Sequence, residues 1–191
     1  MGSVVVTEFI TLDGVIEDPG GAEGFERGGW AFQFERGAEG DKFKLDELMS
    51  ADAQLLGRRT YEGFAAAWPE RTDEMGFAER MNSMPKYVVS TTLDDPSWNN
   101  TTVLREVGEV ARIKDDHDGD VLVAGSASLV QALVEHDLVD ELRLMIFPVV
   151  LGAGKRLFAD GVARQPFRVV ETKQAGEVAI VTLRRAVAAG T

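Results

Sequence analysis

The stretch DVLVAGSASLVQALVEHDL, residues 120–138, decides the fold class. Residues 120–125 are mostly apolar, as expected of a buried strand. In the segment that follows, 126–138, four apolar residues recur at the spacing of one helical face. They are Leu129, Val130, Leu133 and Val134. A turn of small residues, Gly125 to Ser128, joins the two segments. A strand that turns directly into a helix is the repeating unit of a sheet covered by helices, so the stretch predicts an α/β protein.

The same arrangement recurs in LLGRRTYEGF, residues 55–64. Here AQLLG (53–57) predicts a short strand, and Thr60 to Ala67 predicts a helix closed by Trp68-Pro69. The turn between them carries two arginines beside a hydroxyl group. Because helix N-termini present free N–H groups and guanidinium groups bind phosphate well, a turn of this composition is suited to a phosphate. The alternative is that Arg58 and Arg59 are ordinary surface arginines.

The remaining segments alternate in the same way. Strands are predicted at 3–10, 86–91, 101–105 and 141–152, and a hairpin is predicted from 167–174 and 178–186. Helices are predicted at 41–50, 106–116 and 126–138, and 11–39 is predicted to be irregular. Pro148 places the strand at 141–152 at a bulge or a sheet edge. We therefore expect one α/β domain spanning 1–191, with its core at about 3–187, parallel in the middle and antiparallel at the C-terminal end.

Composition limits the function classes. The 191 residues include no cysteine, which excludes disulfides and thiolate metal sites, and DDHDGD (115–120) is too short for a calcium loop, so we predict no metal site. A net charge of −12 argues against nucleic acid as a partner, because such binding relies on Lys and Arg. No signal peptide or membrane-spanning run is evident, so we expect a cytoplasmic protein with no membrane partner.

Three strand ends share one design, in which a strand stops and hydroxyl groups or arginines follow. They are Gly57-Arg58-Arg59-Thr60, Ser90-Thr91-Thr92 and Gly125-Ser126-Ala127-Ser128. Ligands of open α/β sheets lie beyond the carboxyl ends of parallel strands, so together the turns predict a nucleotide site. Each also has a plainer interpretation: Thr60 is a suitable N-cap, and Ser128 with Gln131 forms a capping box.

Five motifs in order resemble the dihydrofolate reductase-like superfamily. They are ITLDG, LLGRRTYEGF, YVVSTTL, VLVAGSASLVQALVEHDLVDELRL and PVVLGAGKRLF. The closer match is the branch homologous to the C-terminal reductase domain of the bifunctional riboflavin-biosynthesis deaminase-reductase, from about Val4 to Leu183. The resemblance implies a single-domain, three-layer fold with a mainly parallel eight-stranded sheet and a C-terminal antiparallel hairpin. It also implies NADPH as hydride donor and a homodimer.

By position, the resemblance implies which residues bind the cofactor. Gly57, Arg58 and Thr60 match the cofactor turn, with Arg58 near the adenosine 2′-phosphate and Thr60 at the pyrophosphate. Ser90 and Thr91 match the residues beside the adenine ribose and the 2′-phosphate. An NADH enzyme more often places an acidic residue on the ribose hydroxyls, so the arginines favour NADPH.

The glycine-rich turn under the pyrophosphate corresponds to Gly125, Ser126, Ala127 and Ser128. The family commonly has Gly-Gly where this chain has Gly125-Ser126. If position 126 requires a positive φ, the serine is strained, and its side chain crowds the pyrophosphate if the backbone packs against it.

The substrate end is predicted from two acidic residues. TLDG (11–14) resembles the loop over the nicotinamide, so Asp13 is a candidate to contact substrate or donate a proton. Asp41 has the spacing of the carboxylate that polarises the pterin in dihydrofolate reductases, with Asp46 and Glu47 further along the same helix. The alternative for Asp41 is ordinary helix capping. Three aromatic residues are candidates for a substrate slot or for packing: Trp30, Phe32 and Trp68.

These features predict an NADPH-dependent oxidoreductase that transfers hydride to a small heterocyclic or carbonyl substrate, such as a ribosylaminopyrimidine of riboflavin biosynthesis. One alternative is a non-catalytic dimeric nucleotide-binding protein, because a fold does not fix a function. A weaker alternative is a dihydrofolate reductase. Turnover of NADPH with an acceptor distinguishes an enzyme from a binding protein.

Overall fold

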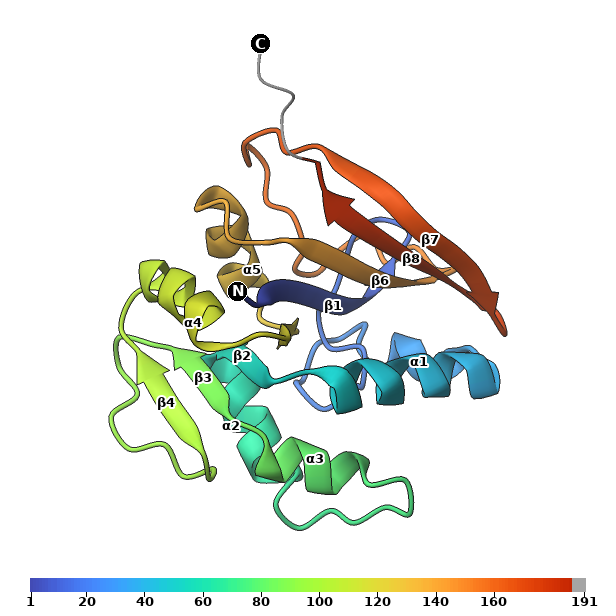
Figure 1. Cartoon of the computed structure of the whole chain (residues 1–191). Helices are drawn as coiled ribbons and strands as arrows, with labels where there is room; N and C mark the ends of the chain where they lie inside the picture. The colour runs from blue at the N-terminus through green and yellow to red at the C-terminus, as the bar shows by residue number, and fades with distance from the viewer. Residues whose placement is uncertain (187–191) are drawn as a thin grey trace.

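Eight strands form one sheet in the order β4-β3-β2-β5-β1-β6-β8-β7 in the computed structural model, which describes residues 1–186 (Figure 1). The strands are Ser3–Thr11 (β1), Ala53–Gly57 (β2), Lys86–Val89 (β3), Thr101–Leu104 (β4), Asp120–Ala124 (β5), Glu141–Phe147 (β6), Phe167–Ala175 (β7) and Val178–Arg185 (β8). The six strands from β4 to β6 run parallel, whereas β8 is antiparallel to both β6 and β7. The predicted mainly parallel sheet and C-terminal hairpin are confirmed.

Helices cover both faces of the sheet. They are Gly37–Ser50 (α1), Arg58–Ala67 (α2), Phe77–Ser83 (α3), Val110–Asp116 (α4) and Ala127–Glu135 (α5), with short 3-10 helices at Trp30–Gln33 and Val107–Glu109. In Figure 1, α4 and α5 lie on one side of the sheet and α1 and α3 on the other. The three-layer α/β fold is therefore confirmed.

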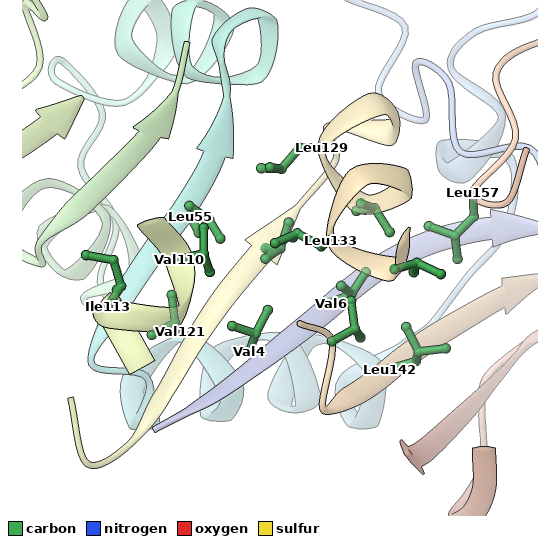
Figure 2. Close-up of a cluster of buried hydrophobic side chains, with 14 of the residues drawn as sticks. Val4, Val6, Leu55, Val110, Ile113, Val121, Leu129, Leu133, Leu142 and Leu157 are labelled. Atoms are coloured by element: carbon green, nitrogen blue, oxygen red, sulfur yellow. The ribbon is translucent and has the colours of Figure 1, made fainter. Parts of the chain in front are cut away.

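The alternation of side chains along the strands builds a core on each face. Val4 and Val6 of β1 point toward α4 and α5, where they pack among Val110 and Leu133 (Figure 2). Val5 points the opposite way, into a cluster shared by α1, α2 and α3. Burying a side chain of this size contributes about 1.5–3 kcal/mol. The central strands are thus held on both faces, and their ends are fixed relative to one another.

Several predicted boundaries were wrong. Helix α1 begins at Gly37 rather than at 41, and α3 was not predicted because its seven residues show no clear apolar period. Strand β6 ends at Phe147 instead of 152, because Pro148 has no N–H to continue the ladder. Strand β3 ends at Val89 rather than 91. The predicted end of the core at 187 lies outside the described residues.

The two capping predictions were also wrong. Helix α2 has Gly57 as its N-cap, so Thr60 lies inside the first turn. Helix α5 has Ser126 as its N-cap, and Ser128 lies within the helix. The Gln131 side chain donates a hydrogen bond to the carbonyl of Arg156 instead of folding back onto the helix start. None of the helices in residues 1–186 has the length and apolar character needed to cross a bilayer.

Candidate functional site

A cavity of about 820 Å³ lies at the carboxyl ends of β1, β2 and β5. Its walls come from those strand ends, from the loop that follows β1, and from α1, α2, α3 and α5. The strand pairing explains the opening. Strands β1 and β5 pair up to Thr7 and Ala124, after which the chain leaves β5 at Gly125 while β1 continues along β6 to Thr11. From Glu8 onward, β1 therefore has no neighbour on its β5 side within the described sheet.

Two strand-to-helix turns meet at one end of this cavity. The backbone N–H of Gly57 donates a 2.8 Å hydrogen bond to Ser126 Oγ, across 69 positions of sequence. Helix α2 begins directly after Gly57 and helix α5 directly after Ser126. Among residues 1–186, no side chain caps either helix start. Two sets of helix N–H donors therefore face one cavity, and such donors bind anions.

The turn before α5 has an unusual backbone. Gly125 has φ +60°, and Ser126 has φ 62° and ψ 50°, so both residues are in the left-handed region. A Cβ atom at Gly125 would lie 3.1 Å from Thr60 Oγ1, which leaves little room for a side chain. The expected strain at Ser126 is therefore present, since a left-handed non-glycine residue costs about 1–2 kcal/mol.

Positive charge gathers at the same end. Arg58, Arg59 and Lys155 all line the cavity. Arg58 Nε donates a 2.7 Å hydrogen bond to Glu62, and its guanidinium group also contacts the Thr92 hydroxyl. This pairing holds Arg58 at the mouth, between α2 and the loop after β3.

Ser90 and Thr91 lie beside this end and do not line the cavity. The Ser90 hydroxyl is buried and accepts backbone hydrogen bonds from Thr92 and Leu93, at 3.2 and 3.0 Å. Thr91 is exposed. The structure thus brings together in the cavity seven of the nine residues predicted to bind cofactor: Gly57, Arg58, Thr60, Gly125, Ser126, Ala127 and Ser128.

A polar network forms another part of the cavity wall. The Thr7 hydroxyl donates to Glu47, at 2.8 Å from Oε1, and accepts a 2.8 Å hydrogen bond from Lys44 Nζ. Lys44 also forms an ion pair with Glu47, three positions along α1. The network fixes a buried carboxylate at the cavity wall, where it can accept hydrogen bonds from a ligand.

Aromatic side chains line the cavity as well. Phe64 of α2, Trp68 directly after α2 and Phe77 of α3 line the cavity, and the Trp68 and Phe77 ring centroids are 5.3 Å apart. Gln54 of β2 also lines it, and its buried Oε1 has no hydrogen-bond partner among the described residues. Flat apolar surface beside a free acceptor is suited to a planar heterocycle with an N–H group.

Comparison with known proteins decides the family. A model of the RibD C-terminal domain matches residues 3–181. The chain belongs to the RibD C-terminal domain family. Among curated relatives of this RibD-type domain, the uncharacterized protein YyaP of Bacillus subtilis (strain 168) is 32% identical over 187 residues, covering 93% of both chains. The uncharacterized protein YwjB of the same organism is 29% identical over 170 residues, covering 88% of this chain and 89% of YwjB.

Solved structures share the fold. A putative riboflavin biosynthesis protein from Shewanella sp. PV-4 is 20% identical and has a TM-score of 0.73, covering 97% of this chain and 99% of its own. The dihydrofolate reductase from Enterococcus faecalis complexed with NADP(H) is 15% identical and has a TM-score of 0.59, with 97% of each chain covered. The dihydrofolate reductase-like fold that the resemblance implied is confirmed.

Asp41 lies outside the cavity of this RibD-type domain. Its carboxylate is exposed and accepts a 2.6 Å hydrogen bond from Arg36 Nε. The physical reason is helical geometry, because position 41 is about a third of a turn away from Glu47 around α1. Glu47 therefore takes the wall position for which the sequence favoured Asp41.

Asp13 anchors a loop and does not line the cavity. It accepts hydrogen bonds from the Thr11 hydroxyl at 2.6 Å and from the backbone N–H of Leu151 and Gly152. The Thr11 hydroxyl and these amides lower the pKa of Asp13 to about 2. A carboxylate that remains ionised at neutral pH is a poor proton donor.

Two of the three aromatic residues considered for a substrate slot line the cavity. Phe32 and Trp68 line the cavity, whereas Trp30 is buried against Phe147 with ring centroids 5.3 Å apart.

The sequence pattern did not predict Glu8, which lines the cavity and is only 5% exposed. The available signal was an acidic residue inside the otherwise apolar strand SVVVTEFI.

A second cavity of about 930 Å³ lies at the other end of the central strands. Its charged side chains largely neutralise one another: Arg143 pairs with Asp120 and Glu141, and Arg184 pairs with Glu141. These internal pairs make it a poor candidate for a ligand site. No cluster of His, Asp and Glu suited to a metal ion is present in residues 1–186.

Proposed function

We propose that this protein is an NADPH-dependent reductase of a small heterocyclic or carbonyl substrate. One observation carries the proposal: a single cavity joins two uncapped helix N-termini and an arginine pair to a chamber with a buried carboxylate and an aromatic wall. Family membership and the dihydrofolate reductase-like fold support the same reaction class.

The residues present suit a phosphorylated dinucleotide. A Cβ atom at Gly57 would lie 3.2 Å from the Ser126 side chain, so the bare backbone is what allows the two turns to meet. Arg58 and Arg59 would hold the 2′-phosphate, and the N–H groups at the start of α5 would hold the pyrophosphate. When bound, NADPH supplies a hydride, and the protein contributes orientation and electrostatics.

The polar network would orient the substrate. Glu47, fixed by Thr7 and Lys44, would accept hydrogen bonds from ring N–H groups, and Gln54 Oε1 would accept another. The Gln54 side-chain amide donates to Met81 Sδ, so both groups are held by neighbours and need little rearrangement on binding. We include a ribosylaminopyrimidine of riboflavin biosynthesis as a substrate to test, on the basis of the family.

The proposal extends to a homodimer. Strand β7 ends the sheet, and its Val169 and Val170 are 61% and 52% exposed. Exposed apolar side chains on an edge strand favour pairing with another chain. Light scattering on the purified protein tests this: a mass twice that of the chain supports the dimer, and the monomer mass rejects it.

Consumption of NADPH, followed by its absorbance, tests the reductase. The acceptors are the ribosylaminopyrimidine, dihydrofolate and a panel of small carbonyl compounds. Oxidation that depends on one of these acceptors and saturates with it supports the proposal. Tight NADPH binding without oxidation by any acceptor supports a nucleotide-binding protein instead.

A further inference from the structure

Glu8 lies where β1 loses its β5 neighbour, at the wall of the cavity. Thr7 is the last β1 residue paired with β5, so the Glu8 side chain lies beside the turn at Gly125. It is 5% exposed, and its Oε1 atom makes no hydrogen bond within the described part of the chain. A buried polar atom without a partner is costly, and such atoms concentrate at functional sites.

The electrostatic surroundings favour the protonated form of the Glu8 carboxyl group. Burial raises the pKa of Glu8 well above its usual value. Glu47 of α1 and Glu23 of the loop after β1 raise this pKa further, whereas Lys44 of α1 and the Gly125 backbone amide lower it by less than burial raises it. The carboxyl group therefore favours its protonated form, and it places an oxygen without a hydrogen-bond partner in the wall of the cavity.

We propose that Glu8 is the proton donor of the reduction. Reducing a C=N or C=O bond requires a hydride on carbon and a proton on the heteroatom. As the substrate carbon accepts the hydride, the O–H bond of Glu8 breaks and a new N–H or O–H bond forms on the substrate. Glu8 is left as a carboxylate and regains a proton from water after product leaves. This inference rests on the proposed NADPH-dependent function.

The other acidic groups are less suited to this role. Both carboxylate oxygens of Glu47 already have partners, because Thr7 hydrogen-bonds to each of them and Lys44 pairs with Oε1. The pKa of Asp13 is about 2, so it holds no proton near neutrality. Glu23 has a raised pKa but lies at the mouth, facing Arg59 and Lys155. Three buried carboxyl groups line the cavity in residues 1–186, those of Glu8, Asp18 and Glu47, and of these only Glu8 has an oxygen without a hydrogen-bond partner.

A binding experiment tests the position of Glu8 without a known substrate. The nicotinamide ring of NADP⁺ carries a positive charge that NADPH lacks, and a nearby cation lowers the pKa of a carboxyl group by about 1–3 units. Binding of NADP⁺ would therefore release a proton from Glu8. We therefore expect the ratio of the NADPH Kd to the NADP⁺ Kd to rise as the pH increases. The total rise should be about tenfold for each unit by which bound NADP⁺ lowers the pKa of Glu8.

The ratio isolates the effect of the ring, because both forms of the cofactor carry the same phosphates. In Glu8→Gln the ratio is expected to be independent of pH, whereas the matched variant Glu23→Gln, also a cavity carboxyl with a raised pKa, keeps the dependence. Calorimetry of the unaltered protein in two buffers of different ionisation enthalpy measures the released proton directly. That measurement remains available if Glu8→Gln does not fold.

The outcomes distinguish a wrong assignment of Glu8 from a wrong reductase proposal. If both cofactor forms bind and their ratio is flat in the unaltered protein, or if Glu8→Gln keeps its slope, the assignment of Glu8 is overturned and the cofactor site stands. If neither form binds, the reductase proposal fails and this inference fails with it. With an acceptor in hand, we expect Glu8→Gln to lower kcat by about 10²–10⁴-fold while NADPH affinity changes little.

Discussion

The N–H of Gly57 donates a 2.8 Å hydrogen bond to the hydroxyl of Ser126, and this bond joins the two turns that form the proposed cofactor end. Ser126 makes the bond from a left-handed backbone conformation that suits glycine better. The hydrogen bond thus links β2 to α5, while the backbone of Ser126 remains strained. The two turns are held as one unit before any ligand arrives.

Two substitutions at this position separate the hydrogen bond from the strain. Ser126→Ala loses the bond and keeps the strained backbone, so we expect it to lower the free energy of unfolding by about 1–2 kcal/mol. Ser126→Gly loses the same bond but relieves the strain, which is worth about 1 kcal/mol. Urea unfolding of both variants should rank alanine below glycine. The reverse order contradicts the left-handed assignment.

Arg58 should determine the preference for NADPH over NADH. Removing one of two arginines at a phosphate site removes a charge-assisted hydrogen bond, worth about 1.5–3 kcal/mol. We therefore expect Arg58→Ala to weaken NADPH binding at least tenfold and to leave NADH binding nearly unchanged. Arg112, exposed on α4 and away from the cavity, gives the control Arg112→Ala. Equal losses of affinity for NADPH and NADH would contradict the assignment of Arg58 to the 2′-phosphate.

The raised pKa of Glu8 makes stability depend on pH. The folded state disfavours ionised Glu8, so its contribution is fully present below the unfolded pKa of 4.5 and is lost as pH rises toward the folded pKa. Glu8→Gln cannot ionise and escapes this loss. We expect its free energy of unfolding, relative to that of the unaltered protein, to increase by up to about 1.4 kcal/mol per pH unit between pH 5 and pH 8, measured as a growing difference in Tm. A constant difference would mean that Glu8 does not titrate with folding.

Asp13 produces the opposite dependence. Because its folded pKa is lowered to about 2, its stabilising contribution is present above the unfolded value of 3.8 and is lost as pH falls through about 2. Asp13→Asn should lower Tm at pH 7, since the amide replaces a carboxylate that holds the Leu151 and Gly152 amides. The difference in Tm should shrink as pH falls from 4 to 2. If it persists at pH 2, the ionised form is not what anchors the loop.

The sequence was sufficient for the elements whose apolar period is clear. The strand–turn–helix unit at 120–138 has side chains such as Val121 and Leu133 that face one core, so its pattern directly predicts its structure. The boundaries failed where local rules compete. Pro148 ended β6 early, and the short helix α3 has no period long enough to detect.

The candidate site was predicted only where its residues lie close together in the sequence. The turns at Gly57 and Gly125 carry their own composition signal, and both line the cavity. The polar network could not be predicted, because Thr7 and Glu47 are 40 positions apart and meet only through the packing of α1 on β1. The favoured Asp41 and Glu47 lie on the same helix, but Asp41 is exposed and Glu47 is buried, which spacing alone did not resolve.

The most direct measurement is thermal unfolding with NADPH, NADH, NADP⁺ and no ligand. A ligand that binds only the folded state at a hundred times its Kd raises stability by about 2.7 kcal/mol. For a domain of this size, that corresponds to an increase of about 5–10 °C in Tm. We predict such a shift with NADPH and NADP⁺ and a much smaller one with NADH. No shift with any of the three nucleotides would contradict the cofactor site and the reductase that depends on it.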